Sequence, residues 1–118
     1  MIITLPWPDK RLSPNARLHW RAKINPKRNA REDAAWSTKA SDGFHSCRAA
    51  LPASGSIRVK VTFYPPDRRH RDDDNMIGGF KAARDGIASA LGVDDRRFRP
   101  EYHFAEPEKP GRVEVVIL

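Results

Sequence analysis

Three consecutive aspartates stand out in this chain because their carboxylates must repel one another. Asp72, Asp73 and Asp74 follow the basic run 68–71 (RRHR), in a protein whose net charge is +7. Adjacent like charges are unfavourable unless a cation or a shifted pKa relieves them. Carboxylate oxygens are hard ligands that suit Mg²⁺ or Mn²⁺, and arginines suit phosphates. The stretch predicts a divalent-metal site beside a phosphate-binding site; the plainer interpretation is that one aspartate caps a helix.

Two further features lie along and beyond the helix expected after these aspartates. Asp94 and Asp95 come directly after its end, so carboxylates flank both ends of one element. The two clusters can meet if the return loop folds back. Lys81 follows Asp74 by two helical turns and so lies on the same face. It is suited to offset phosphate charge or to hold the attacking water, although an isolated lysine of this kind is usually an ordinary surface residue.

Positive charge is concentrated in the first third of the chain. The stretch Lys10–Arg31 contains eight Lys and Arg residues and no acidic residue. Clustered basic charge of this kind is typical of proteins that bind a polyanion, and we favour nucleic acid over a solvated basic surface. The candidate DNA contacts are Arg17, Arg21, Lys23, Lys27 and Arg28, with Arg68, Arg69 and Arg71 beside the aspartates.

Residues 9–28 contain two prolines and no apolar periodicity, so we expect an irregular basic arm that orders on DNA. Trp20 and His19 lie among its arginines, where an aromatic ring can stack on an unpaired base. The alternative, that Trp20 packs at the edge of the core, is equally compatible with the sequence.

Hydrophobic periodicity predicts the elements that position these residues. Alternating apolar residues indicate strands at 57–64 and 112–118, and shorter apolar runs indicate strands at 1–5 and 102–105, with "PEKPG" as the last turn. Helices are expected from Asn29 to Leu51 and from Asp74 to Leu91. The order β-α-β-α-β-β predicts a two-layer α+β domain with a mixed sheet, spanning residues 1–118.

Several individual residues carry their own expectations. Asn29 should cap the first helix, whose apolar stripe should contain Trp36, Ala40, Phe44, Cys47 and Leu51. The pair Gly78-Gly79 inside the second helix should mark the close approach of DNA or of a packed backbone.

The composition fits an intracellular protein. A chain of 118 residues suits one compact domain, and its single cysteine excludes an intramolecular disulfide. We expect neither a signal peptide nor a membrane span, and a cytoplasmic location.

The motifs together resemble the RusA family of Holliday-junction resolvases from bacteria and their prophages. They are "LPWP", "PDRRHRDDDN", Lys81-Ala82-Ala83 and "ALGVDD", and they span nearly the whole chain. The resemblance implies a homodimeric, Mg²⁺-dependent endonuclease that binds four-way DNA junctions and nicks two opposed strands. The family's catalytic carboxylates fall on Asp72, Asp74 and Asp95, its lysine aligns best with Lys81, and the basic residue before the first aspartate is Arg71.

Two positions depart from the family pattern. Asp73 stands where the family usually has an apolar residue. The spacing from Asp74 to Lys81 is longer than in the best-known member, and Gly78 occupies the place that a direct count gives the lysine.

The sequence therefore predicts a crossover junction endodeoxyribonuclease that uses Mg²⁺, or Mn²⁺ in its place, held by Asp72, Asp74 and Asp95. Two alternatives remain open at this point. One is a nucleic-acid-binding module without catalysis, such as a phage regulator, which leaves the aspartates unexplained. The other is a nuclease acting on flaps, RNA or other branched nucleic acids.

Overall fold

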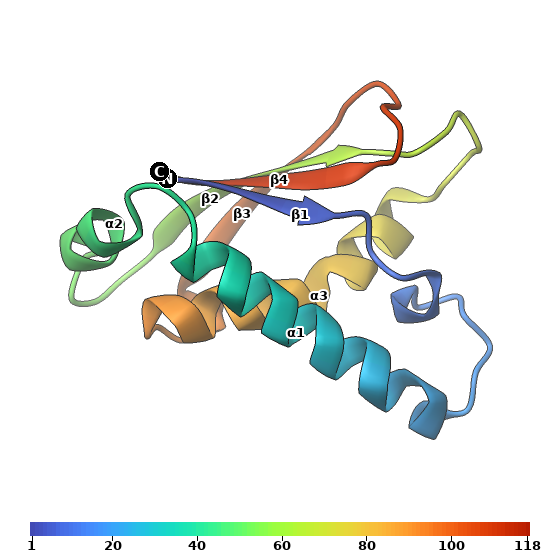
Figure 1. Cartoon of the computed structure of the whole chain (residues 1–118), viewed down its shortest axis with the longest axis horizontal. Coiled ribbons are helices and arrows are strands. Elements are labelled where there is room, and N and C mark those ends of the chain that lie inside the picture. Colours follow the sequence, from blue (N-terminus) through green and yellow to red (C-terminus); the bar gives the residue numbers. More distant parts are fainter.

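Four strands form one mixed sheet in the computed structural model, which describes residues 1–118. They are β1 (Ile2–Pro6), β2 (Ile57–Tyr64), β3 (Phe98–Phe104) and β4 (Arg112–Ile117), in the spatial order β1-β4-β2-β3. Strand β4 is antiparallel to β1 and β2, whereas β3 is parallel to β2. Strands β1, β2 and β3 therefore point the same way, and their carboxyl ends share one edge of the sheet (Figure 1).

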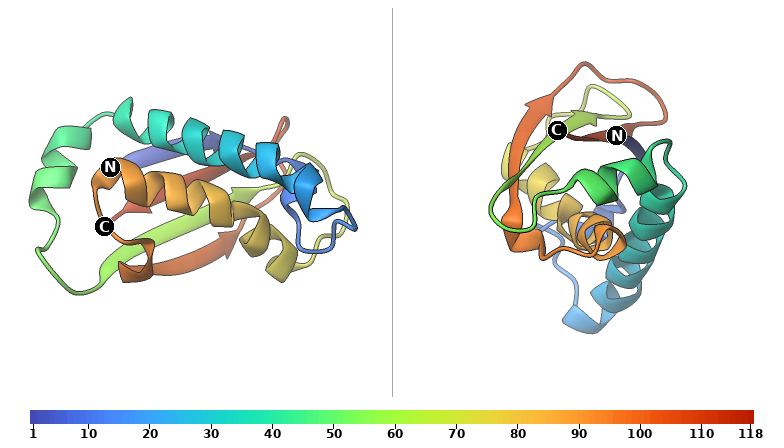
Figure 2. Two further views of the ribbon diagram at one scale, coloured as in Figure 1. Left: turned by 90° about the horizontal axis from the view of Figure 1, so that it is seen from below. Right: turned by 90° about the vertical axis from the view of Figure 1, so that its left-hand side faces the viewer.

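Three α-helices accompany the sheet: α1 (Ile24–Lys39), α2 (Phe44–Ala50) and α3 (Asp73–Leu91). Helices α1 and α3 lie side by side on one face, and the opposite face has no covering helix (Figure 2). The two-layer α+β architecture with a mixed sheet is thus as the sequence predicted. None of the helices is both long and apolar enough to cross a membrane.

The core fills the space between the sheet and the two long helices. The alternating residues Ile57, Val59, Val61 and Phe63 of β2 are buried, as their spacing predicted. Helix α3 contributes buried side chains at helical spacing, including Phe80, Ile87 and Leu91. The core therefore fixes α3 against β2, and with it the direction in which the start of α3 faces.

Helix α1 begins earlier than expected. It starts at Ile24 and not after an Asn29 cap, so residues 24–28 belong to the helix and not to the basic arm. Pro26 had suggested a break, but it lies in the first turn, where a proline costs no helical hydrogen bond. Lys27 and Arg28 are consequently fixed on a helix.

The expected single helix over 29–51 is two helices. Helix α1 ends at Lys39, and α2 starts after Gly43, whose φ of 80° belongs to the left-handed region. The predicted apolar stripe is wrong at Trp36, whose side chain is 73% exposed, and at Ala40, which is also exposed. Ala34 and Thr38 face the core instead. Thr38 can be buried because its hydroxyl donates to the carbonyl of Ala34 at 2.7 Å.

The last two strands also differ from expectation. Strand β3 starts at Phe98, four residues before the predicted start at Tyr102, and pairs with β2 over its whole length. The turn before β4 does not join neighbouring strands, because β4 lies on the other side of β2. The chain from β3 thus crosses the end of β2 and brings residues 105–111 to the edge shared by the parallel strands.

The glycines of α3 mark contacts within the chain. A Cβ on Gly78 would overlap the ring of Pro14 in the arm, and a Cβ on Gly86 would overlap the carbonyl group of Arg31 in α1. At Gly79 the nearest atom to such a Cβ is Pro8 Cβ at 3.8 Å, an ordinary contact. The close approach predicted for the Gly78-Gly79 pair therefore exists at Gly78 alone, and its partner is the arm.

Candidate functional site

The three aspartates lie at the start of α3, at the edge where β1, β2 and β3 end. Asp72 occupies the N-cap position, but its carboxylate makes no capping hydrogen bond. Asp73 and Asp74 lie in the first turn, where the helix dipole favours negative charge. All three side chains are exposed. The simpler interpretation, in which one aspartate caps the helix through its carboxylate, therefore accounts for none of the three.

The partners of these carboxylates are few. Asp72 Oδ1 lies 3.3 Å from Nε2 of His70, and Asp73 and Asp74 form no ion pair. The arginines beside them do not neutralise them either, because Arg68 is paired with Glu106 at 3.8 Å and Arg71 with Asp67 at 2.9 Å. Negative charge is thus left unpaired at this helix terminus, as a site for a cation requires.

Two adjoining hollows open in front of the aspartates. One, of about 330 Å³, lies between residues 7–15 and the start of α3, with Trp7 and Asp72 among its lining residues. The other is lined only by polar residues, namely Asn15 and residues 70–75. The arm therefore forms one wall of the space that the carboxylates face.

Arg71 has a role that its place in the sequence did not indicate. Its guanidinium is bonded to the Asp67 carboxylate and to the carbonyl oxygens of Asp67 and Arg69, at 2.9, 3.3 and 3.0 Å. It also lies 5.5 Å from the centre of the Trp7 ring, which makes a cation–π contact. With 19% of its side chain exposed, Arg71 is placed to fix the loop that delivers Asp72, whereas the side chains of Arg68 and Arg69 are exposed.

Asp67 anchors this loop from the other side. The backbone amide of Arg69 donates to its carboxylate at 2.9 Å, and this bond, followed by the Arg71 guanidinium, lowers the pKa of Asp67. The loop from β2 to α3 is therefore braced within itself, independently of any DNA.

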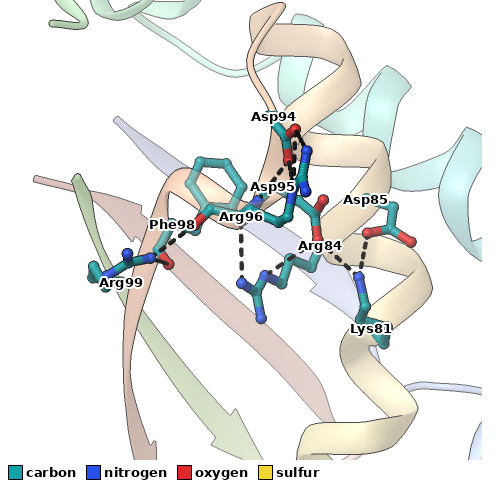
Figure 3. A network of polar contacts seen from close by, with 8 residues as sticks. All are labelled: Lys81, Arg84, Asp85, Asp94, Asp95, Arg96, Phe98 and Arg99. Carbon is teal, nitrogen blue, oxygen red and sulfur yellow. Dashed lines mark hydrogen bonds and ion pairs between the residues drawn. The ribbon is translucent and has the colours of Figure 1, made fainter. Parts of the chain in front are cut away.

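Lys81 and Asp95 form a second cluster farther along α3 (Figure 3). The Lys81 Nζ donates to Asp85 Oδ1 and to Asp95 Oδ2, each at 2.8 Å. The hydrogen bond to Asp85, then that to Asp95, raises the pKa of Lys81. Lys81 in turn lowers the pKa of Asp95, mainly through the same hydrogen bond. The return loop does fold back, but its aspartate meets the middle of α3 and not its start.

Asp94 and Arg84 complete this cluster. Asp94 accepts bonds from the guanidinium and the backbone amide of Arg96, which lower its pKa to about 2. Arg84 donates from Nη2 to the backbone carbonyl of Asp95 at 3.1 Å. The Asp94 carboxylate is therefore paired with Arg96. Of the two adjacent aspartates, Asp95 is the one that contacts α3.

The structure groups the predicted catalytic residues as two pairs. Asp72 and Asp74 share the helix start, and Asp95 contacts Lys81; the rise from Asp74 to Lys81 is roughly 10 Å along the axis. No three His, Cys, Asp or Glu side chains form a metal-binding group. Mg²⁺, however, is usually bound through one or two carboxylates together with waters and substrate phosphates. The exposed carboxylates of Asp72 and Asp74, of which only Asp72 has a partner, His70, fit that requirement.

The predicted DNA contacts in the arm and at the start of α1 lie on one largely exposed segment. Arg17, Arg21, Lys27 and Arg28 are exposed and Lys23 is half-buried, and none of the five forms an ion pair. Trp20 is 63% exposed, so it does not pack at the core edge. Its ring lies against His19, with 5.6 Å between ring centres, and 5.3 Å from the Arg21 guanidinium carbon. Of the two expectations for Trp20, an exposed ring that is free to stack on a base is therefore the one compatible with the geometry.

Three residues of the site were not singled out by the sequence. Asp85 could have been found, because an acidic residue four positions after Lys81 is a standard helical pair. The contact of Arg84 with Asp95 depends on how the return loop folds, and the contact of Trp7 with Arg71 joins segments far apart in the chain. No local signal indicates the last two.

Comparisons with known proteins add one relative. An uncharacterized protein of Xylella fastidiosa (strain Temecula1 / ATCC 700964) is 48% identical over 103 residues, which are 81% of this chain and 61% of that protein. The chain thus spans about three fifths of the length of this relative. No family model matches the chain.

Proposed function

We propose that this protein is an Mg²⁺-dependent, structure-selective endonuclease of the RusA type, which resolves four-way DNA junctions by paired nicking. The observation that carries the proposal is the start of α3, where three exposed carboxylates lack a cationic partner other than His70. Such charge is costly to gather unless a cation and a phosphate complete it. The exposed side chains of Arg68 and Arg69 beside these carboxylates would bind the DNA phosphate.

Asp72 and Asp74 would hold the metal ion, which when bound supplies an activated water and stabilises the leaving oxygen. Asp95 is proposed as a third ligand, and to serve as one it must exchange its contact with Lys81 for a contact at the metal. Lys81 offsets charge on the phosphate that is cut. Arg71 contributes by fixing the 67–72 loop, so that Asp72 stays at the mouth of the hollow.

The arm and the start of α1 supply most of the affinity for DNA. Exposed lysines and arginines that meet phosphates release counterions, which gives strong binding at low salt. Trp20, exposed and flanked by Arg21, is placed to stack on a base left unpaired at the crossover. DNA of the host or of a phage is reached in the cytoplasm, where we place the protein.

A strand-mapping assay tests the proposal against its two alternatives. End-labelled four-way junctions and flaps of matched sequence are incubated with the protein, with and without Mg²⁺. Paired nicks in opposed junction strands support the proposal. Cutting confined to flaps or to RNA supports the simpler nuclease, and binding without any cutting supports a non-catalytic module.

A further inference from the structure

Lys81 is held by two carboxylates that come from different parts of the chain. Asp85 lies one turn farther along the same helix, whereas Asp95 belongs to the loop that returns from the end of α3 (Figure 3). Both distances to the Lys81 Nζ are 2.8 Å. Asp85 and Asp95 lie at the same distance from Lys81, but they differ in whether another cation is within reach if the contact with Lys81 breaks.

Asp95 has a second cation within reach. The Nε of Arg84 is buried without a hydrogen-bond partner, and it lies 4.0 Å from Asp95 Oδ2. A small movement of the Asp95 carboxylate would satisfy that nitrogen, and a buried donor without a partner is unfavourable. Asp95 can therefore leave Lys81 without losing all cationic contact, since Arg84 also holds its backbone carbonyl.

Asp85 has no such alternative. Its only ion pair is with Lys81, and both residues are carried by the same rigid helix four positions apart. This contact survives any movement of the loop that carries Asp95. A flexible lysine side chain that is already held loses less conformational entropy when a reaction needs it in one place.

We propose that Asp85 is a positioning residue, which keeps the Lys81 ammonium in place when the Asp95 carboxylate turns from Lys81 toward Arg84. This inference rests on the nicking activity proposed above. It assigns to Asp85 an effect on cutting that passes entirely through Lys81, and no contact with DNA.

A double-mutant cycle tests this route. Asp85→Ala should lower the single-turnover nicking rate about 10- to 100-fold, with junction affinity nearly unchanged, because Lys81 is misplaced and no DNA contact is lost. In a Lys81→Met background, Asp85→Ala should cause no further loss. Asp85→Asn, which keeps an oxygen acceptor, should retain more of the rate than Asp85→Ala. An equal loss from Asp85→Ala with and without Lys81 would overturn the proposal.

A second measurement does not depend on cutting. NMR relaxation of the Lys81 side-chain ammonium is measured in DNA-free protein that carries Asp95→Ala, where Asp85 is the remaining partner of Lys81. Adding Asp85→Ala to that protein should increase the mobility of the ammonium. The matched control is Glu32→Ala on α1, which removes an exposed acidic residue that forms no ion pair and should leave Lys81 unchanged. Unchanged order at Lys81 when Asp85→Ala is added to the Asp95→Ala protein overturns the proposal. If the wild-type protein nicks neither junctions nor flaps, the proposed function fails, and the anchoring of Lys81 is then decided by this mobility alone.

Discussion

The carboxylates of Asp72, Asp73 and Asp74 differ in how they can meet a cation although they are adjacent in the chain. Asp72 precedes the helix in extended backbone, and Asp73 and Asp74 lie in its first turn. Asp72 lines both hollows at the site, whereas Asp73 and Asp74 line only the more open one. The family pattern places metal ligands at Asp72 and Asp74, with Asp73 between them at a position that is usually apolar.

Removing the charge of Asp72 or Asp74 should separate cutting from binding. Asp72→Asn and Asp74→Asn should each abolish Mg²⁺-dependent nicking, while junction affinity is kept or increased because an anion facing phosphate is lost. Asp73→Asn is the matched control and should have a milder effect. Single-turnover nicking and a binding titration in Ca²⁺ measure the two quantities, and near-normal nicking by both Asn variants would contradict the metal-site assignment.

At the residue scale, the residues of the candidate site were easier to predict from the sequence than the contacts that they make. The carboxylates and Lys81 were found from residue type and spacing. The pairing of Lys81 with Asp95 was not predicted, since it depends on how far the return loop folds along α3. The bracing role of Arg71 depends on Trp7, which is 64 positions away in the chain and contributes a ring that only the folded structure brings near.

At the element scale, the packing of α1 on α3 holds the site together. Gly86 of α3 lies against the carbonyl of Arg31 in α1, so the two helices approach closely at that point. Periodic strands such as β2 were predicted well because one face is buried along their whole length. Helix α1 was predicted poorly, because Pro26 was interpreted as a helix breaker and because the buried residues of the helix, Pro26, Ala34 and Thr38, form no large apolar stripe.

Gly86→Ala should weaken this helix contact. The added methyl group has no room beside the Arg31 carbonyl, so we expect a loss of about 1–3 kcal/mol in the free energy of unfolding. Gly79→Ala on the same helix is the control, because its methyl group meets only Pro8 at 3.8 Å. That variant should be unchanged or more stable by up to about 1 kcal/mol, since alanine favours helix. Urea denaturation of both variants measures the free energy of unfolding. Equal values for the two variants would contradict the close contact between Gly86 and Arg31.

At the scale of the whole molecule, the carboxyl ends of three parallel strands, the start of α3 and the basic arm meet at one end of the sheet (Figure 1). The unpaired negative charge and the free positive charge therefore lie on neighbouring segments, as the proposed activity requires. The other basic cluster, at residues 96–99, is engaged within the chain: Arg96 pairs with Asp94, and Arg97 donates to the carbonyls of Pro52 and Gly55. The arm and the start of α1 together are therefore the larger free basic surface.

Replacing the five basic residues of this surface should flatten the salt dependence of junction binding. The variant carries Ser at Arg17, Arg21, Lys23, Lys27 and Arg28. Each lost phosphate contact should reduce the slope of log affinity against log salt by about one. A charge-matched control carries Ser at five basic residues outside the arm: Lys39, Arg48, Arg58, Lys60 and Lys109. An unchanged slope in the arm variant, with a reduced one in the control, would place the DNA on another face.

The protein should be a C2 homodimer in solution. A four-way junction presents two equivalent strands, and isologous pairing of two copies is the simplest way to present two identical sites to them. Light scattering at micromolar concentration, with and without junction DNA, measures the mass. A monomer under both conditions would argue against paired nicking.

The most direct test of the proposed activity is the Mg²⁺-dependent nicking of a labelled four-way junction, compared with a linear duplex of the same arm sequence. We expect the wild-type protein to introduce paired nicks in opposed strands of the junction and to leave the duplex intact. The Asp74→Asn protein, assayed alongside, should bind the junction without nicking it. Failure of the wild-type protein to cut the junction in Mg²⁺ or Mn²⁺, or equal cutting of junction and duplex, would contradict the assignment of a junction-resolving endonuclease.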